Sequence, residues 1–96
     1  VSNMLDSHQL ASFYLLSEQL IYRSLALLKE DYPLDVAIIL CEYIASLYTF
    51  QESLLHFKDP LKDGNVNIEE VVKALMNQCS HIELEIQHCG ISLTLH

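Results

Sequence analysis

The sequence predicts an all-α fold, and three observations lead to this prediction. Only two glycines and two prolines occur in 96 residues, a scarcity that disfavours an architecture of many strands and turns. Hydrophobic residues make up 51% of the chain and charged residues 19%, which is typical of a globular domain rather than a disordered segment. Apolar residues also recur with helical periodicity. We therefore expect a single helical-bundle domain over residues 1–96, an antiparallel bundle of three long helices at about 6–31, 33–58 and 67–89, open to completion by a partner helix or a second copy.

The first helix is expected to begin at Asp6, whose carboxylate can cap the free N–H groups while Gln9 reaches back. Its end is set by Pro33, because the residue before a proline is pushed out of the helical region. Apolar side chains cover well over half of its circumference, so it needs to be covered from two directions. Four polar residues form one narrow stripe: Ser12, Gln19, Arg23 and Glu30.

The second helix should start at Pro33, which suits a first helical turn, and the short connection favours an αα-hairpin. It is apolar almost all round, so we expect it to be the central element of the bundle. The window 36–50 holds 12 apolar residues in 15, but it includes Glu42 and is too short to span a bilayer. A polar residue recurs at every seventh position: Asp35, Glu42, Thr49 and His56.

The third helix is predicted to begin at Asn67, with Glu70 at the reciprocal capping-box position. After Gly90 the pattern changes to alternation, so the sequence allows either a C-cap at this glycine with an extended tail or a longer helix. A seam with alternating spacings of four and three residues follows the start, a coiled-coil type of pattern. It comprises Ile68, Val72, Leu75, Cys79, Ile82, Ile86, Cys89 and Leu93.

The segment 59–70 resembles an EF-hand calcium loop, with acidic residues at its first, fifth and twelfth positions, which are Asp59, Asp63 and Glu70. This resemblance implies a calcium site, because Ca²⁺ takes six to eight oxygen ligands. The third position departs from the pattern, because Leu61 has no side-chain oxygen. A structural loop followed by a helix cap explains the same residues, and it is the interpretation that we prefer.

No catalytic site is predicted. His81, Glu85 and His88 lie on one side of the third helix, and Glu-x-x-His occurs in di-iron bundles, but this face points away from the apolar seam. We interpret it as a solvated polar face. No nucleophile elbow or glycine-rich phosphate loop is present in the sequence, so we expect neither an enzyme nor a cofactor. Three cysteines are interpreted as small buried hydrophobes in a reducing compartment: Cys41, Cys79 and Cys89.

The charge distribution narrows the class of partner. The formal net charge is −8, from 13 acidic and 5 basic residues, and the basic residues are scattered. Nucleic acids and anionic membranes require clustered lysine or arginine, so both are expected to be poor partners. No positive region followed by an apolar block begins the sequence, and we expect a cytoplasmic protein, with the nucleus as the alternative.

The function that the sequence favours is a non-enzymatic protein-interaction or oligomerisation module. The first two helices carry more apolar surface than an isolated three-helix bundle can bury, and a partner helix or a second copy could cover it. An EF-hand-like calcium module is one alternative. In helix number the chain is also similar to MIT-type three-helix modules, which implies a binder of short helical motifs as a further alternative. The aromatic residues expected to anchor a partner are Tyr14, Tyr22, Tyr43 and Tyr48.

Overall fold

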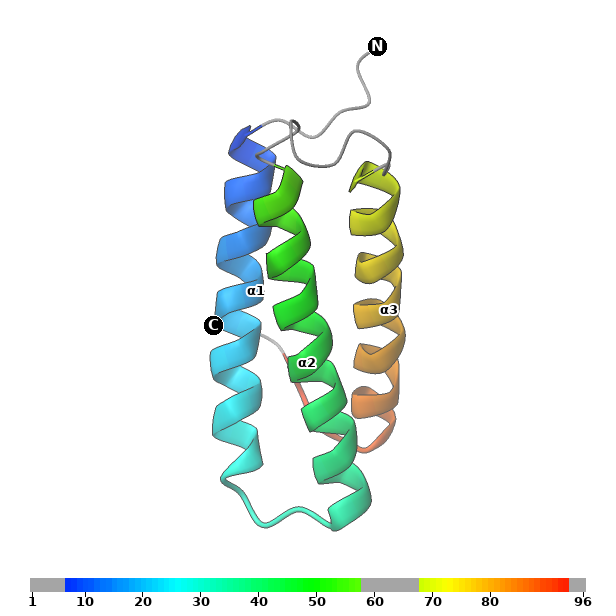
Figure 1. Cartoon of the computed structure of the whole chain (residues 1–96). Helices are drawn as coiled ribbons and strands as arrows, with labels where there is room; N and C mark the ends of the chain where they lie inside the picture. The colour runs from blue at the N-terminus through cyan, green and yellow to red at the C-terminus, as the bar shows by residue number, and fades with distance from the viewer. Residues whose placement is uncertain (1–6, 58–67, 94–96) are drawn as a thin grey trace.

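The computed structural model describes residues 7–57 and 68–93, and the described part of the chain contains three α-helices and no strand. They are α1 (Ser7–Leu28), α2 (Leu34–Phe57) and α3 (Ile68–His88). The helices lie side by side, and the start of α1, the end of α2 and the start of α3 are at the same end of the molecule (Figure 1). The predicted all-α class is therefore confirmed.

The helix α2 is the central element, as its composition predicted. It packs against α1 on one side and α3 on the other, whereas no Cα atom of α1 lies within 8 Å of a Cα atom of α3. This arrangement fits the composition of the helices, because α2 is the most apolar of the three and needs a neighbour on two sides. By length and apolar composition Leu34–Leu55 could also cross a membrane, a property that the core helices of soluble proteins share.

The core consists of two clusters of buried side chains. The larger one joins all three helices and the C-terminal tail, and the smaller one lies near the start of α1 and the end of α2. Leu40, Tyr43 and Val72 are completely or almost completely inaccessible to solvent. The predicted seam of α3 is buried from Val72 to Ile86, except for the half-buried Leu75.

The first connection explains why two helices are shorter than predicted. At the end of α1 the N–H of Lys29 donates to the carbonyl of Ala26 and that of Glu30 to Leu27. These three-residue turns tighten the last turn and end α1 at Leu28 rather than at residue 31. The carbonyl of Pro33 accepts the N–H of Ala37, so α2 starts one residue after the proline. The predicted caps Asp6 and Asn67 lie outside the described residues.

The end of α3 settles the two alternatives at Gly90. The N–H of Gly90 donates to the carbonyl of Gln87, and the N–H of Ile91 donates to that of Ile86. This pair of bonds is a Schellman motif, which requires the left-handed φ of 81° that Gly90 adopts. Ile91 and Ile86 belong to the same core cluster, the apolar contact that accompanies this motif.

After the Schellman motif the chain crosses from the end of α3 towards α1 (Figure 1). Ile91 and Leu93 are buried in the larger core cluster. The guanidinium of Arg23 donates to the carbonyl of Ser92 at 3.2 Å. The tail therefore links the end of α3 to α1, although no Cα atom of one helix lies within 8 Å of the other. Cys89, the seventh seam residue, is exposed because the helix ends before it.

We predict that Gly90→Ala lowers the free energy of unfolding by about 1 kcal/mol, the cost of a left-handed conformation for an L-residue with a Cβ atom. No atom lies within 4 Å of the position that a Cβ would take, so the penalty comes from the backbone alone. Urea denaturation measures it. Gly90→Asn is the matched control and should cost less, because asparagine tolerates this region. Equal losses in the two variants would contradict the backbone explanation.

Candidate functional site

The four tyrosines predicted as anchors occupy different environments. Tyr43 is completely buried, and its hydroxyl donates to Oε1 of Glu83 at 2.6 Å. Tyr14 is half-buried and packs on the smaller core cluster. Tyr22 and Tyr48 are 68% and 52% exposed. The fold therefore leaves two of the four tyrosines at the surface, and Tyr43 has a structural position between α2 and α3.

Tyr48 belongs to a repeating pattern on α2. Seven residues spaced by alternating steps of four and three all lie on its exposed side, and five of them are apolar or aromatic beside one cysteine and one glutamate. This spacing is that of a coiled-coil contact surface, in which a repeat of 3.5 residues per turn keeps one line of side chains towards a neighbouring helix. We call this line the outer seam of α2; it comprises Leu34, Ile38, Cys41, Ala45, Tyr48, Glu52 and Leu55.

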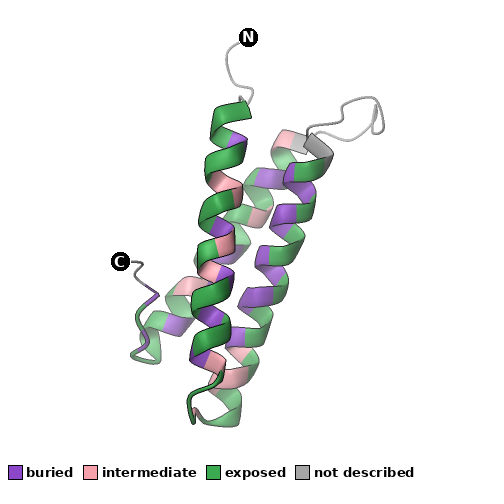
Figure 2. Ribbon diagram, turned by 90° about the vertical axis from the view of Figure 1, so that its left-hand side faces the viewer, coloured by how far each residue is buried: buried purple, intermediate pink, exposed green. Residues whose placement is uncertain are grey.

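A second line with the same spacing follows α1. Every member is exposed except Glu18, which is half-buried. We call it the outer seam of α1; it comprises Ala11, Leu15, Glu18, Tyr22 and Leu25. Exposed positions recur along the whole length of the helices in the view from the α1 side (Figure 2). Each of the two helices of the hairpin, α1 and α2, thus leaves one line of side chains with heptad-like spacing largely exposed.

The two outer seams lie at matching levels. The amide of Gln51 donates to Oε1 of Glu18 at 2.7 Å, and α1 and α2 run in opposite directions (Figure 1). Residues at one level therefore have numbers that add up to about 70, since both helices rise equally per residue. This register pairs the seam residues as layers: Leu15 with Leu55, Glu18 with Glu52, Tyr22 with Tyr48, and Leu25 with Ala45.

The two outer seams together form what we call the outer face. Its seven large apolar side chains expose between 38% and 76% of their surface, equivalent to about four complete side chains. At roughly 150 Å² per large side chain, the lower end of the range for aromatic residues, this is roughly 600 Å². The largest apolar patch of an ordinary monomer is about 300–600 Å². The seven are Leu15, Tyr22, Leu25, Leu34, Ile38, Tyr48 and Leu55.

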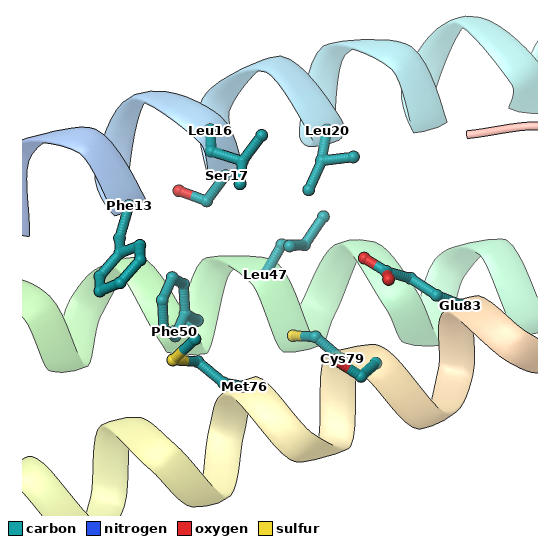
Figure 3. A pocket seen from close by; sticks show the side chains of 10 residues that line it. Phe13, Leu16, Ser17, Leu20, Leu47, Phe50, Met76, Cys79 and Glu83 are labelled. Carbon is teal, nitrogen blue, oxygen red and sulfur yellow. The ribbon is translucent and has the colours of Figure 1, made fainter. Parts of the chain in front are cut away.

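A cavity of about 260 Å³ lies on the other side of α1, in the space between α1 and α3 (Figure 3). Side chains from all three helices converge on it, among them Phe13, Phe50 and Met76. Two polar side chains that line it form hydrogen bonds within the protein. The hydroxyl of Ser17 donates to the carbonyl of Tyr14, and Glu83 accepts a hydrogen bond from the hydroxyl of Tyr43. The cavity therefore results from the separation of α1 and α3 over α2.

The thiol of Cys79 lines this cavity and is a weak nucleophile there. Burial, with a smaller contribution from the negative charge of Glu83, raises its pKa to about 11, so the thiol is protonated at neutral pH. Cys41 and Cys89 are exposed, and the prediction that all three cysteines are buried is wrong for these two. Cys41 lies on the outer seam of α2, where no other helix covers it, and Cys89 follows the end of α3.

The metal candidates are only partly described. Asp59 and Asp63 of the EF-hand-like segment lie outside the described residues, so the calcium hypothesis stays a prediction. Glu70 is exposed in the first turn of α3. Nε2 of His81 lies 3.7 Å from Oε1 of Glu85, and the two side chains are 78% and 47% exposed. Within residues 7–57 and 68–93, no three His, Cys, Asp or Glu side chains form a group that could hold a metal ion.

No protein-family model, no curated protein and no solved structure matches this chain. The geometry of the described residues is therefore the basis for a functional proposal.

We predict that Cys41 and Cys89 react with a thiol-specific reagent at pH 7.5 at least tenfold faster than Cys79, because only the last is buried with a raised pKa. Single-cysteine variants followed by mass spectrometry measure the three rates. The rate at Cys79 should rise to the level of the other two in urea above the unfolding midpoint. A fast reaction of native Cys79 would contradict its position in the core.

Tyr43→Phe should lower the free energy of unfolding by about 1–2 kcal/mol at pH 7, because Glu83 loses a charge-assisted hydrogen bond. Burial is the largest cause that raises the pKa of Tyr43 well above its ordinary value. The hydrogen bond to Glu83 and the negative charge of Glu83 raise it further. A raised pKa in the folded state stabilises the fold below about pH 10, the unfolded pKa of tyrosine, and this contribution falls as the pH rises further. Between pH 9 and 11, the free energy of unfolding should therefore fall less in Tyr43→Phe than in the wild type. Denaturation at each pH measures this difference.

Proposed function

We propose that this chain is a non-enzymatic protein-interaction module, and that its outer face is the surface that receives the partner. The observation that supports the proposal is the exposed area of this face: about four complete large side chains, arranged on two helices. Leaving apolar area in water is unfavourable by about 25 cal/mol per Å². Covering it by a partner recovers that free energy.

The size of the outer face fits a protein partner. Stable protein interfaces bury about 800 Å² on each side, and these seven side chains expose a large part of such an area, roughly 600 Å². Two tyrosines lie at the middle of the face, Tyr22 on α1 and Tyr48 on α2. Tyrosine is enriched among the residues that dominate binding energy at the centre of interfaces.

The spacing of the outer face supports a helical partner. Both seams have the alternating four and three residue steps of coiled coils, and their layers lie at matching levels. A partner helix lying between the two seams could place side chains of its own between successive layers. This proposal has two forms. In one, the chain binds a short helical motif of another protein; in the other, a second copy of the chain supplies the helices of an oligomer.

We predict that Tyr48→Glu abolishes capture of partner proteins from a cell extract or self-association in sedimentation analysis, whichever the wild type displays. A carboxylate at the centre of an apolar interface is desolvated without a counter-charge. Because Tyr48 is 52% exposed, the variant should keep the melting temperature of the wild type within about 2 °C, since substitutions at exposed sites are usually within about 0.5 kcal/mol.

The matched control is Leu84→Glu, because Leu84 is 56% exposed but lies on α3, outside the outer face. This variant should retain every partner of the wild type. The proposal fails if Tyr48→Glu and Leu84→Glu behave alike, or if the wild type is monomeric and captures nothing that depends on Tyr48.

A further inference from the structure

The charges of the outer face indicate which kind of helix it receives. One layer within it is acidic: Glu18 and Glu52 lie at the same level, between the layer of Leu15 with Leu55 and the layer of Tyr22 with Tyr48. This layer interrupts an otherwise apolar line on both helices. Because a carboxylate buried in an interface without a counter-charge is strongly unfavourable, the layer selects what can be placed against it.

Among the described residues, no basic side chain forms an ion pair with either carboxylate. Glu18 accepts a hydrogen bond from the neutral amide of Gln51, which satisfies an acceptor but leaves the negative charge. Glu52 is exposed. The exposed border of α2 beside its outer seam carries two more acidic residues, Asp35 and Glu42. The outer face is thus an apolar surface with negative charge both in its interior and along one border.

Within residues 7–57 and 68–93, positive charge on this side of the molecule is scarce. Arg23 is directed to the carbonyl of Ser92 in the tail. Lys29 follows the end of α1, at the level of Cys41, and it continues the outer seam of α1. The described residues of a second copy would therefore offer one lysine for two seam carboxylates, and two chains that each carry a net charge of −8 would be brought together.

We propose that the outer face binds an amphipathic helix of another protein that carries lysine or arginine at the seam position opposite Glu18 and Glu52. The proposal rests on the function proposed above and names the chemistry of its partner. Apolar side chains of that helix lie against the layers of Leu15, Tyr22 and Leu25, and its cation lies between the two carboxylates. Further basic residues on the side of the helix nearest α2 face Asp35 and Glu42.

The test uses three synthetic 21-residue helical peptides that share a leucine seam with steps of four and three residues. They differ at one central seam position, which is lysine, glutamine or glutamate. Fluorescence anisotropy with the full chain at about 0.1 M salt should give the tightest binding for the lysine peptide, at least tenfold tighter than for the glutamate peptide. Raising the salt concentration to about 0.5 M should reduce this difference, because screening weakens ion pairs near the surface.

Charge reversal supplies the matched control. Glu52→Lys should invert the order, so that the glutamate peptide binds more tightly than the lysine peptide. Glu85→Lys makes the same charge change on the exposed side of α3 and should leave the order of the wild type unchanged. Circular dichroism verifies that both variants remain helical.

Equal affinities for the three peptides, or the same shift in both charge variants, would overturn the choice of a basic partner. Binding of none of them would also overturn it, and a partner captured in a Tyr48-dependent manner would then still support the interaction module. Self-association that Tyr22→Glu abolishes would replace the foreign helix by a second copy. Loss of every Tyr48-dependent interaction as well would remove the proposed function itself.

Discussion

The structure depends on the burial of one side of α2 between α1 and α3, which approach this helix more closely than they approach each other. Leu40, Tyr43 and Leu54 are at most 1% exposed, and replacing such a residue with alanine typically costs 2–5 kcal/mol. Because α1 and α3 both pack on α2, the free energy of each contact depends on the position of this one helix. Hydrogen bonds between helices then determine the register: Gln51 with Glu18 between α1 and α2, and Tyr43 with Glu83 between α2 and α3.

Two other features of the molecule follow from this dependence on α2. On the inner side, α1 and α3 do not pack closely against each other. Ile91 and Leu93 of the tail fill part of the space between them, and the cavity is the part that remains. On the outer side, the seven large apolar side chains of the two seams are only partly covered by the described residues. The arrangement therefore buries the apolar surface of α3 more completely than that of α1 and α2. The apolar side chains of α1 and α2 that stay exposed form the outer face.

The outer face illustrates how one sequence pattern can serve two surfaces. Both α1 and α2 contain apolar residues for the core and, offset from them around the helix, a second line that is exposed. In the proposed complex, the acidic layer of Glu18 and Glu52 would add specificity rather than attraction for apolar surfaces in general, because an unsuitable partner would bury two unpaired carboxylates. An apolar surface interrupted in this way is also less prone to unspecific association than an uninterrupted one.

The amino-acid sequence by itself determined the all-α class, the three helices to within about three residues at each described end, the central position of α2 and the buried seam of α3. It did so because periodicity and turn chemistry are local properties that each segment carries with it. It could not tell which tyrosines are exposed, and it misassigned Cys41 and Cys89, because a residue on an apolar helix is covered only where a neighbouring helix approaches. Only the tertiary structure decided this, through the separation of α1 from α3 and the register of α1 against α2, which bring Glu18 to Glu52 and Tyr22 to Tyr48 from positions far apart in the chain.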